Sequence, residues 1–211
     1  MKNIRNYIIE RLHLGSEIAH YNDTKIIPKT TAELNKCIIE LVEDYGGSQQ
    51  VLNLNCIDTS HITDMQLIFA GCNPINIDIS EWDVSHVTDM RRMFAYCSNL
   101  RSVGDLSQWN VSRVQNMRSM FYACENLEEL TGLNKWHPDS VTDMSFMFYD
   151  CYKLQQIDNM ENFNMQRVKS MQYMFYNCKK LSDIGDISKW NINKHAVKHS
   201  MFTGSGIKHN A

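Results

Sequence analysis

The sequence predicts an α/β repeat solenoid of six coils, each about 25–27 residues long, with a capping helix before the first coil. One observation is a phenylalanine column that recurs first after 25 residues and then after every 27 residues. A second is that Met, Cys and Trp hold fixed distances from these phenylalanines. A third is an apolar triplet between a Cys and the next aromatic position, such as Leu127, Leu130 and Leu133. A period of about 20–50 residues is typical of proteins whose units bury their apolar faces by stacking on their neighbours.

The columns run through the whole repeat region. The phenylalanines are Phe69, Phe94, Phe121, Phe148, Phe175 and Phe202. Four positions earlier lie Met65, Met90, Met117, Met144 and Met171, and three positions later lie Cys72, Cys97, Cys124, Cys151 and Cys178. Twelve positions before the phenylalanines lie Ile57, Trp82, Trp109, Trp136, Phe163 and Trp190. Apolar columns at a fixed phase predict one continuous core.

The segment at 82–97, WDVSHVTDMRRMFAYC, and the segment at 58–72, DTSHITDMQLIFAGC, resemble the repeats of BspA-like leucine-rich repeat proteins. The resemblance covers about residues 51–202. It implies a right-handed, leucine-rich-repeat-like solenoid and a role in attachment or protein recognition, because this family is best known from bacterial surfaces. The last coil departs from the pattern, with His195 and Lys198 in place of Val and Met. That change suggests a C-terminal end without an apolar stacking partner.

Composition gives little support for nucleic acid or membranes as partners. A formal net charge of −3 provides no global attraction to nucleic acid or to an anionic membrane. No apolar run approaches the roughly 20 residues of a membrane span. The first residues also lack the apolar stretch and cleavage site of a secretion signal. We therefore expect the protein to be cytoplasmic, or to be incorporated into a virion.

Sulfur-containing residues are numerous, but their spacing favours a structural role. Five of the seven Cys residues belong to the repeat column, and no CxxC pair occurs. Stacked coils would align them as a ladder of buried thiols; ladder disulfides or a metal site are the alternatives. His195 and His199 are four residues apart but have no Cys or carboxylate between them. We therefore predict neither a metal site nor a cofactor.

Residues 1–14 place Ile4, Tyr7, Ile8 and Leu12 on one face of a short amphipathic helix. A helix this short is marginal alone in water, so it would dock on the solenoid or wait for a partner. The segment also resembles the N-terminal targeting peptides that direct internal proteins into the heads of tailed bacteriophages. Both alternatives, a docking helix and a targeting peptide, stay open.

A linker and a helix are predicted between this segment and the first coil. Residues 15–29 contain Gly, Asn, Asp and Pro without a sustained period and predict a linker. Residues 30–47 predict a helix that begins with a Thr30/Glu33 capping box and ends at Gly46-Gly47. Its apolar face is Leu34, Cys37, Ile38, Leu41, Val42 and Tyr45. We expect this helix to cover the apolar end of the first coil.

Within the solenoid at 48–202, each apolar triplet predicts a short strand, and the following aromatic-Asp-x-Ser segment predicts a turn. The V-x-D/N-M-x-x-M-F segment predicts an extended piece that runs into a helical turn. Recurring Asp and Asn residues fit turn maintenance better than acid–base catalysis, which needs two carboxylates in different environments. No phosphate loop, GxSxG or HExxH motif occurs, so we predict no enzyme. Residues 203–211 predict a frayed tail.

The sequence thus predicts a non-catalytic protein-binding module whose recognition residues vary between coils. Two surfaces are candidates. The strand face carries Arg101, Asp105, Glu128, Glu129, Gln155, Gln156, Asp158, Asp183 and Asp186, whose acidic bias predicts a basic protein partner. A tyrosine stripe carries Tyr122, Tyr149 and Tyr176, which could instead be edge packing. A virion or assembly protein delivered by its N-terminal peptide and a surface adhesin-like protein are the alternative functions, and the oligomeric state stays open.

Overall fold

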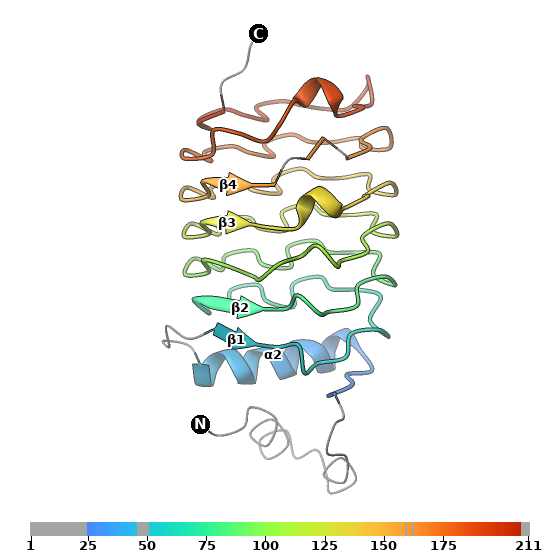
Figure 1. Ribbon diagram of the computed structural model, residues 1–211, viewed down its shortest axis with the longest axis vertical. Coiled ribbons are helices and arrows are strands. Elements are labelled where there is room, and N and C mark those ends of the chain that lie inside the picture. The colour runs from blue at the N-terminus through green and yellow to red at the C-terminus, as the bar shows by residue number, and fades with distance from the viewer. Residues whose placement is uncertain (1–24, 46–50, 159, 162, 208–211) are drawn as a thin grey trace, which may run out of the picture.

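The repeated segments stack along one axis, with a helix across the N-terminal end of the stack (Figure 1). The computed structural model describes residues 25–45, 51–158, 160, 161 and 163–207. The helix is α2 (Thr31–Tyr45). The strands are β1 (Val51–Asn53), β2 (Asn76–Asp78), β3 (Glu129–Leu130) and β4 (Gln156–Ile157). Two short 3-10 helices, η1 (Leu133–Lys135) and η2 (Ile187–Lys189), complete the regular structure of the described residues. We name each coil after its phenylalanine.

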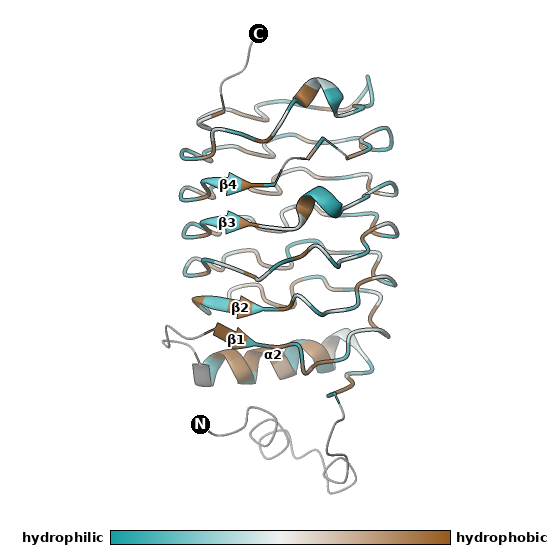
Figure 2. Cartoon of the chain, viewed as in Figure 1, coloured by the Kyte–Doolittle hydropathy of each residue, from teal (hydrophilic) through white to brown (hydrophobic). Residues whose placement is uncertain are grey.

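The strand face is the side of the stack that carries β1 to β4 (Figure 1). β1 pairs in parallel with β2, and β3 pairs in parallel with β4, so that Leu52 lies opposite Ile77 and Leu130 lies opposite Ile157. In β2 the buried Ile77 lies between two half-buried polar residues, an alternation that Figure 2 displays as a change in hydropathy. The buried apolar side chains of these strands, Leu52, Ile77, Leu130 and Ile157, therefore point into the stack. The neighbouring positions point outward, and at the start of β1 that position is the exposed Val51.

A second face, which we call the ladder face, carries the longest run of backbone pairing. In the Phe121 coil, four alternate N–H groups donate to carbonyl oxygens of the Phe148 coil. These bonds are Met117 to Asp143 (2.9 Å), Ser119 to Ser145 (2.9 Å), Phe121 to Met147 (2.8 Å) and Ala123 to Tyr149 (2.8 Å). The same four positions repeat this pattern in every step from Met65 to Asn177. The coils are thus fixed to one another by hydrogen bonds of constant direction.

The chain at the ladder face turns without forming a helix. In each coil, the residue two positions before the phenylalanine and the residue two positions after it have positive φ. Ser119 (φ 57°) is the third residue of the turn closed by the bond from Met120 N–H to Met117 O, and Ala123 (φ 55°) has the same place before Cys124. The prediction of a helical turn at this position is therefore wrong. Among the described residues, α2 alone is α-helical.

The physical reason lies in the direction of the N–H groups. A helical turn would point its N–H groups along its own axis, whereas these turns leave alternate N–H groups free to reach the next coil. A left-handed residue other than glycine costs about 1–2 kcal/mol. The inter-coil hydrogen bonds and the buried side chains between them offset that cost. In the described part of the chain, the capping helix α2 is therefore the one α-helical element that supports the predicted α/β class.

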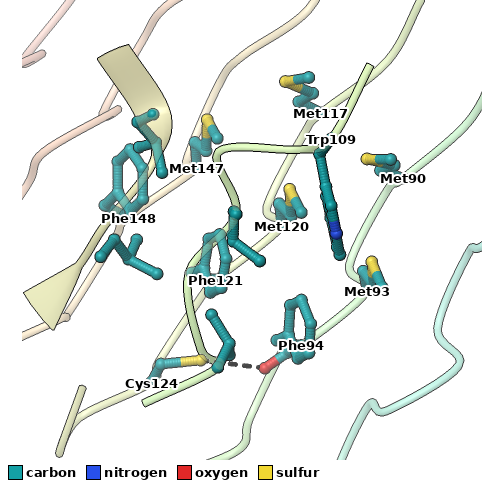
Figure 3. Close-up of a cluster of buried hydrophobic side chains, with 14 of the residues drawn as sticks. Met90, Met93, Phe94, Trp109, Met117, Met120, Phe121, Cys124, Met147 and Phe148 are labelled. Atoms are coloured by element: carbon teal, nitrogen blue, oxygen red, sulfur yellow. Dashed lines mark hydrogen bonds between the residues drawn. The ribbon is translucent and has the colours of Figure 1, made fainter. Parts of the chain in front are cut away.

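The core is built from the stacked sequence columns (Figure 3). The Phe121 ring stacks on Phe94 and Phe148, with centroids 5.0 and 5.7 Å away. The Trp109 indole lies parallel to that of Trp136, at 6.1 Å. Such stacks bury large aromatic areas in a regular geometry. These stacks explain why each column of the sequence keeps the same type of residue, and not merely any apolar residue.

The indole N–H groups of Trp82, Trp109 and Trp136 bond to the backbone of an earlier coil, whereas that of Trp190 has no hydrogen-bond partner among the described residues. The Trp109 indole N–H donates to the Ile79 carbonyl at 3.1 Å, and the Cys124 thiol donates to the Phe94 carbonyl at 3.0 Å (Figure 3). The Cys97, Cys151 and Cys178 thiols likewise donate to the phenylalanine carbonyl of the preceding coil, and all of these Cys residues are free. Burial raises the pKa of the Cys124 thiol well above its usual value, which keeps it protonated as a donor.

Helix α2 closes the N-terminal end of the stack with its apolar face, where Leu34, Ile38 and Leu41 are buried. It begins at a capping residue, because the Glu33 N–H donates to the Thr30 hydroxyl at 3.2 Å. The Glu33 carboxylate accepts from the Lys29 N–H at 2.8 Å, one residue before the expected partner of a capping box. Gly46-Gly47, the predicted end, lies outside the described residues.

Two polar side chains of α2 satisfy two of the carbonyl groups that the first coil presents at the end of the ladder. The Thr31 hydroxyl donates to the Asp64 carbonyl at 2.6 Å, and the Asn35 amide donates to the Ile68 carbonyl at 2.9 Å. Every later coil receives such donors from the backbone of the coil before it. Residues four apart lie on one face of a helix, so α2 supplies donors in place of a preceding coil.

We expect Asn35→Leu to destabilise the protein by about 1–3 kcal/mol, because the carbonyl of the buried Ile68 loses its donor. Leu resembles Asn in size and is the better helix former, so neither size nor helix propensity explains a loss. Urea unfolding would measure the change. Lys36→Ala, at an exposed neighbouring position, is the control. Equal unfolding midpoints for the two variants would show that the hydrogen bond does not matter.

Two predicted segment boundaries differ from the structure. Ile26, in the predicted linker 15–29, is buried and pairs with the first coil, since its N–H donates to Cys56 O and its carbonyl accepts from Asp58 N–H. In the predicted tail 203–211, the Gly206 N–H donates to Cys178 O at 3.1 Å, and Ile207 packs on the core. Gly206 is needed for this contact, because a Cβ there would lie 2.8 Å from the Leu181 carbonyl oxygen. Residues 15–24 and 208–211 lie outside the described residues.

Candidate binding surface

The strand-face candidates align in part as a column across the coils. The Glu128 N–H donates to Arg101 O at 3.2 Å, and the Gln155 N–H donates to Glu128 O at 2.9 Å. The Arg101 guanidinium lies 3.8 Å from the Glu128 carboxylate. Both side chains are about half exposed, so this ion pair adds little stability. It does reduce the net negative charge of the strand face at its centre.

Four strand-face carboxylates have a local task that the sequence did not assign to them. Asp105 accepts from the Ser107 N–H, Asp183 accepts from the Gly185 N–H, and Asp186 accepts from the Ser188 N–H, each at 2.9 Å. Asp158 accepts from the Gly132 N–H.

These bonds close turns within or between coils. Hydrogen bonds from the Ser188 side chain and backbone hold the pKa of Asp186 below its ordinary value. Glu129, Gln155 and Gln156 are the exposed candidates that remain on this face.

The tyrosine stripe lies on the ladder face, one residue beyond the phenylalanine column. Tyr149 stacks on Tyr122 at 4.9 Å and on Tyr176 at 4.8 Å, with the rings within 7° of parallel. All three side chains are half-buried. Partial burial raises the pKa of the Tyr122 and Tyr149 hydroxyls. Because both faces of the Tyr149 ring are covered by neighbours, the exposed part of the ring is its edge.

A second aromatic column beside the stripe was missed by sequence reasoning. Phe146 stacks on Tyr173 at 5.0 Å, and His199 meets Tyr173 edge-on at 5.3 Å. This column contacts the stripe, because Phe146 lies 5.8 Å from Tyr149 and 6.5 Å from Tyr122. Tyr96 joins at the N-terminal side, 5.3 Å from Tyr122. We call this set the aromatic surface: Tyr96, Tyr122, Phe146, Tyr149, Tyr173 and Tyr176.

The second column has a sequence signal, but a weak one. It occupies the position two before each phenylalanine, where the chain has Leu67, Arg92, Ser119, Phe146, Tyr173 and Ser200. Only two of these six residues are aromatic, so the position does not stand out as a column. The left-handed backbone at this position is what turns Phe146 and Tyr173 toward the stripe.

The remaining sequence predictions concern the N-terminal residues, metal sites and membrane spans. Ile4, Tyr7, Ile8 and Leu12 lie outside the described residues. Among the described residues, no group of three or more His, Cys, Asp or Glu side chains gathers as metal ligands. No helix in the described part of the chain has the length and hydropathy to cross a membrane.

Comparisons with known proteins support the repeat fold. The family model described as "Mycoplasma protein of unknown function, DUF285" matches residues 40–130 and 104–210, which together span most of the chain. The chain is also similar to the crystal structure of a leucine-rich repeat protein from Eubacterium ventriosum, with a TM-score of 0.50 and 16% identity. That similarity covers 79% of this chain but only 46% of the other. Comparison with curated proteins gives no match. Both findings agree with the resemblance to BspA-like leucine-rich repeat proteins.

Proposed function

We propose that this chain, which belongs to the DUF285 family, is a non-catalytic protein-binding module that recognises its partner through the aromatic surface of the ladder face. The proposal takes the repeats as a right-handed solenoid of six coils. The observation that carries it is the joining of two aromatic columns into one half-exposed surface that extends over successive coils. Extended surfaces of this kind are how repeat proteins bind partners.

Aromatic side chains are suited to this role for two reasons. They are enriched at protein interfaces, and a Tyr or Phe side chain loses little rotamer freedom on binding. Here the ring stacks and the inter-coil hydrogen bonds already hold the side chains in place. A surface that is ordered before binding avoids part of the entropy cost of association.

The strand face is the weaker candidate. Its aspartates at 105, 158, 183 and 186 accept backbone hydrogen bonds in turns, which explains their presence without a partner. Its remaining acidity would favour a basic protein, and association would then slow as salt rises. Glu129 is exposed and makes no ion pair with a described residue. A substitution at Glu129 therefore tests the strand face without breaking an ion pair among the described residues.

A binding role also fits better than catalysis. The recurring carboxylates occupy equivalent positions in successive coils, whereas an acid–base pair needs two carboxylates in different environments. The similarity to a leucine-rich repeat protein concerns the fold alone, and a fold can host many functions. The non-catalytic assignment therefore rests on the chain's own residues.

We expect Tyr149→Ser to weaken binding by more than ~1 kcal/mol if Tyr149 is a central contact. The measurement is the affinity for a partner recovered from the native source, with Glu129→Lys as the matched surface control. Thermal unfolding of Tyr149→Ser must show that it is folded at the assay temperature, because Tyr149 stacks on two neighbours. If the Glu129→Lys variant loses affinity and the Tyr149→Ser variant does not, the strand face is the binding surface.

Two further roles remain proposals. One is a virion or assembly protein delivered by residues 1–14, and the other is a surface adhesin-like protein. Removal of residues 1–24 leaves every described element in the chain. If that deletion abolishes association with particles while the Tyr149→Ser variant still associates, delivery by the N-terminal peptide is the better assignment.

A further inference from the structure

A small hollow lies on the aromatic surface, where three coils meet. Its lining residues are Arg92, Ala95, Tyr96, Arg118, Ser119, Tyr122 and Phe146, and its volume is about 150 Å³. Pockets that bury a whole small molecule are larger, roughly 300–1,000 Å³. The hollow is therefore of a size to take the end of one side chain.

The hollow exists because small residues interrupt the columns. Two positions before the phenylalanine, Ser119 lies between Arg92 of the preceding coil and Phe146 of the following coil. One position after the phenylalanine, Ala95 precedes Tyr122. Larger side chains at these two positions would fill the space. The hollow thus follows from the variation between coils and not from the repeat itself.

Two guanidinium groups make the hollow positively charged. Arg118 is held in place, since it donates to the Ser145 hydroxyl at 2.8 Å and lies 4.9 Å from the centroid of the Phe146 ring. Its one carboxylate neighbour in the described structure, Asp143, is 3.7 Å away. Arg92 is exposed and forms no ion pair with any described residue. Both guanidinium groups line the hollow, whereas the nearby carboxylates, Asp143 beside Arg118 and Asp150 near the Tyr122 hydroxyl, are not among its lining residues.

We infer that this hollow is a subsite for the carboxylate side chain of a peptide segment that lies along the aromatic surface. Arginine is the preferred partner of a carboxylate, because its planar fork of N–H donors matches the two oxygens. Tyr96, which is 59% exposed, and Phe146 offer apolar walls for the methylene groups of a glutamate. The inference rests on the proposed function, since it assumes that a protein partner binds this face.

Charge also separates this subsite from the strand face. An acidic segment is attracted by Arg92 and Arg118, whereas the strand face, with Glu129 exposed, would repel it. The two faces therefore select partners of opposite charge. The sign of the charge on the recovered ligand therefore decides whether the aromatic surface or the strand face binds it.

Selection from a displayed library of random short peptides, against the immobilised full chain, tests the inference. We expect the enriched peptides to contain Asp or Glu beside an apolar residue. Arg92→Gln and Arg118→Gln should each lower the affinity of a synthetic enriched peptide at least tenfold, and Glu129→Lys should leave it unchanged. Arg92 is exposed and outside the core, so its variant keeps the fold. Binding of the acidic peptides to Arg92→Gln with unchanged affinity would overturn the assignment.

The remaining outcomes separate this inference from the proposed function. Enriched peptides without acidic residues that lose affinity to Tyr149→Ser would refute the carboxylate subsite but support the aromatic surface. Enriched peptides that bind Tyr149→Ser and Arg92→Gln as well as the parent chain would refute both. A selection that enriches no peptide would also count against both, because a preformed surface should retain some members of the library.

Discussion

Replacing Leu41 with Asp is expected to unfold the N-terminal end of the solenoid and to cause aggregation. Leu41 is only 1% exposed and belongs to the apolar face of α2 in the continuous core. An unpaired carboxylate at a buried site costs several kcal/mol. Detachment of α2 would also remove the side-chain donors to Asp64 O and Ile68 O. The first coil would then expose unpaired carbonyls and apolar residues, which promote edge-to-edge association.

Thermal unfolding together with light scattering would measure this effect. Glu43→Ala, on the exposed side of the same helix, is the control and should leave both measurements unchanged. Leu41→Ala should fall between the two, with a loss of about 2–5 kcal/mol. A Leu41→Asp protein that melts like the parent and stays monomeric would mean that α2 does not close the core.

Phe121→Ala is expected to lower the free energy of unfolding by about 3–5 kcal/mol. The Phe121 side chain is 0% exposed, and its ring is stacked on both sides, by Phe94 and Phe148. Truncation would remove these contacts and leave a cavity that the rigid ladder cannot collapse to fill. The loss should therefore lie near the upper end for a core phenylalanine.

Phe202→Ala, in the same column at the C-terminal end, is the matched control. Phe202 is half-buried and stacks on Phe175 at 5.7 Å. Because each coil contacts mainly its neighbours, truncation in the terminal coil should cost distinctly less. Urea unfolding of both variants gives the comparison. Equal losses would contradict a core built by stacking from coil to coil.

The ladder face joins stability to recognition. The hydrogen bonds that hold Ser119 and Phe121 against the next coil also fix the backbone beneath Tyr122 and Phe146. Buried columns of Phe, Met and Cys lie directly under this backbone. A surface mutation such as Tyr149→Ser can therefore be compared with a core mutation such as Phe121→Ala on one scaffold, to separate lost contacts from lost order.

The sequence by itself determined the core of this protein. Phe121, Trp109, Met117 and Cys124 recur with a fixed phase, and a fixed phase of apolar residues directly indicates which side chains are buried. The sequence also indicated a helix before the first coil, where the structure has α2 (Thr31–Tyr45). Periodicity suffices for such features, because burial of apolar area is the dominant favourable term in folding and does not depend on detailed geometry.

Only the tertiary structure decided how the polar and variable residues are used. Asp158 was expected to face a partner, but its carboxylate accepts from Gly132, 26 residues earlier. Asn35 was simply a polar residue of a helix until Ile68 came within hydrogen-bond distance of it. Such contacts depend on the register between coils and on left-handed turns, neither of which leaves a periodic signature. The meeting of Arg92, Arg118 and Phe146 has the same cause, because each residue lies on a different coil and only stacking brings them together.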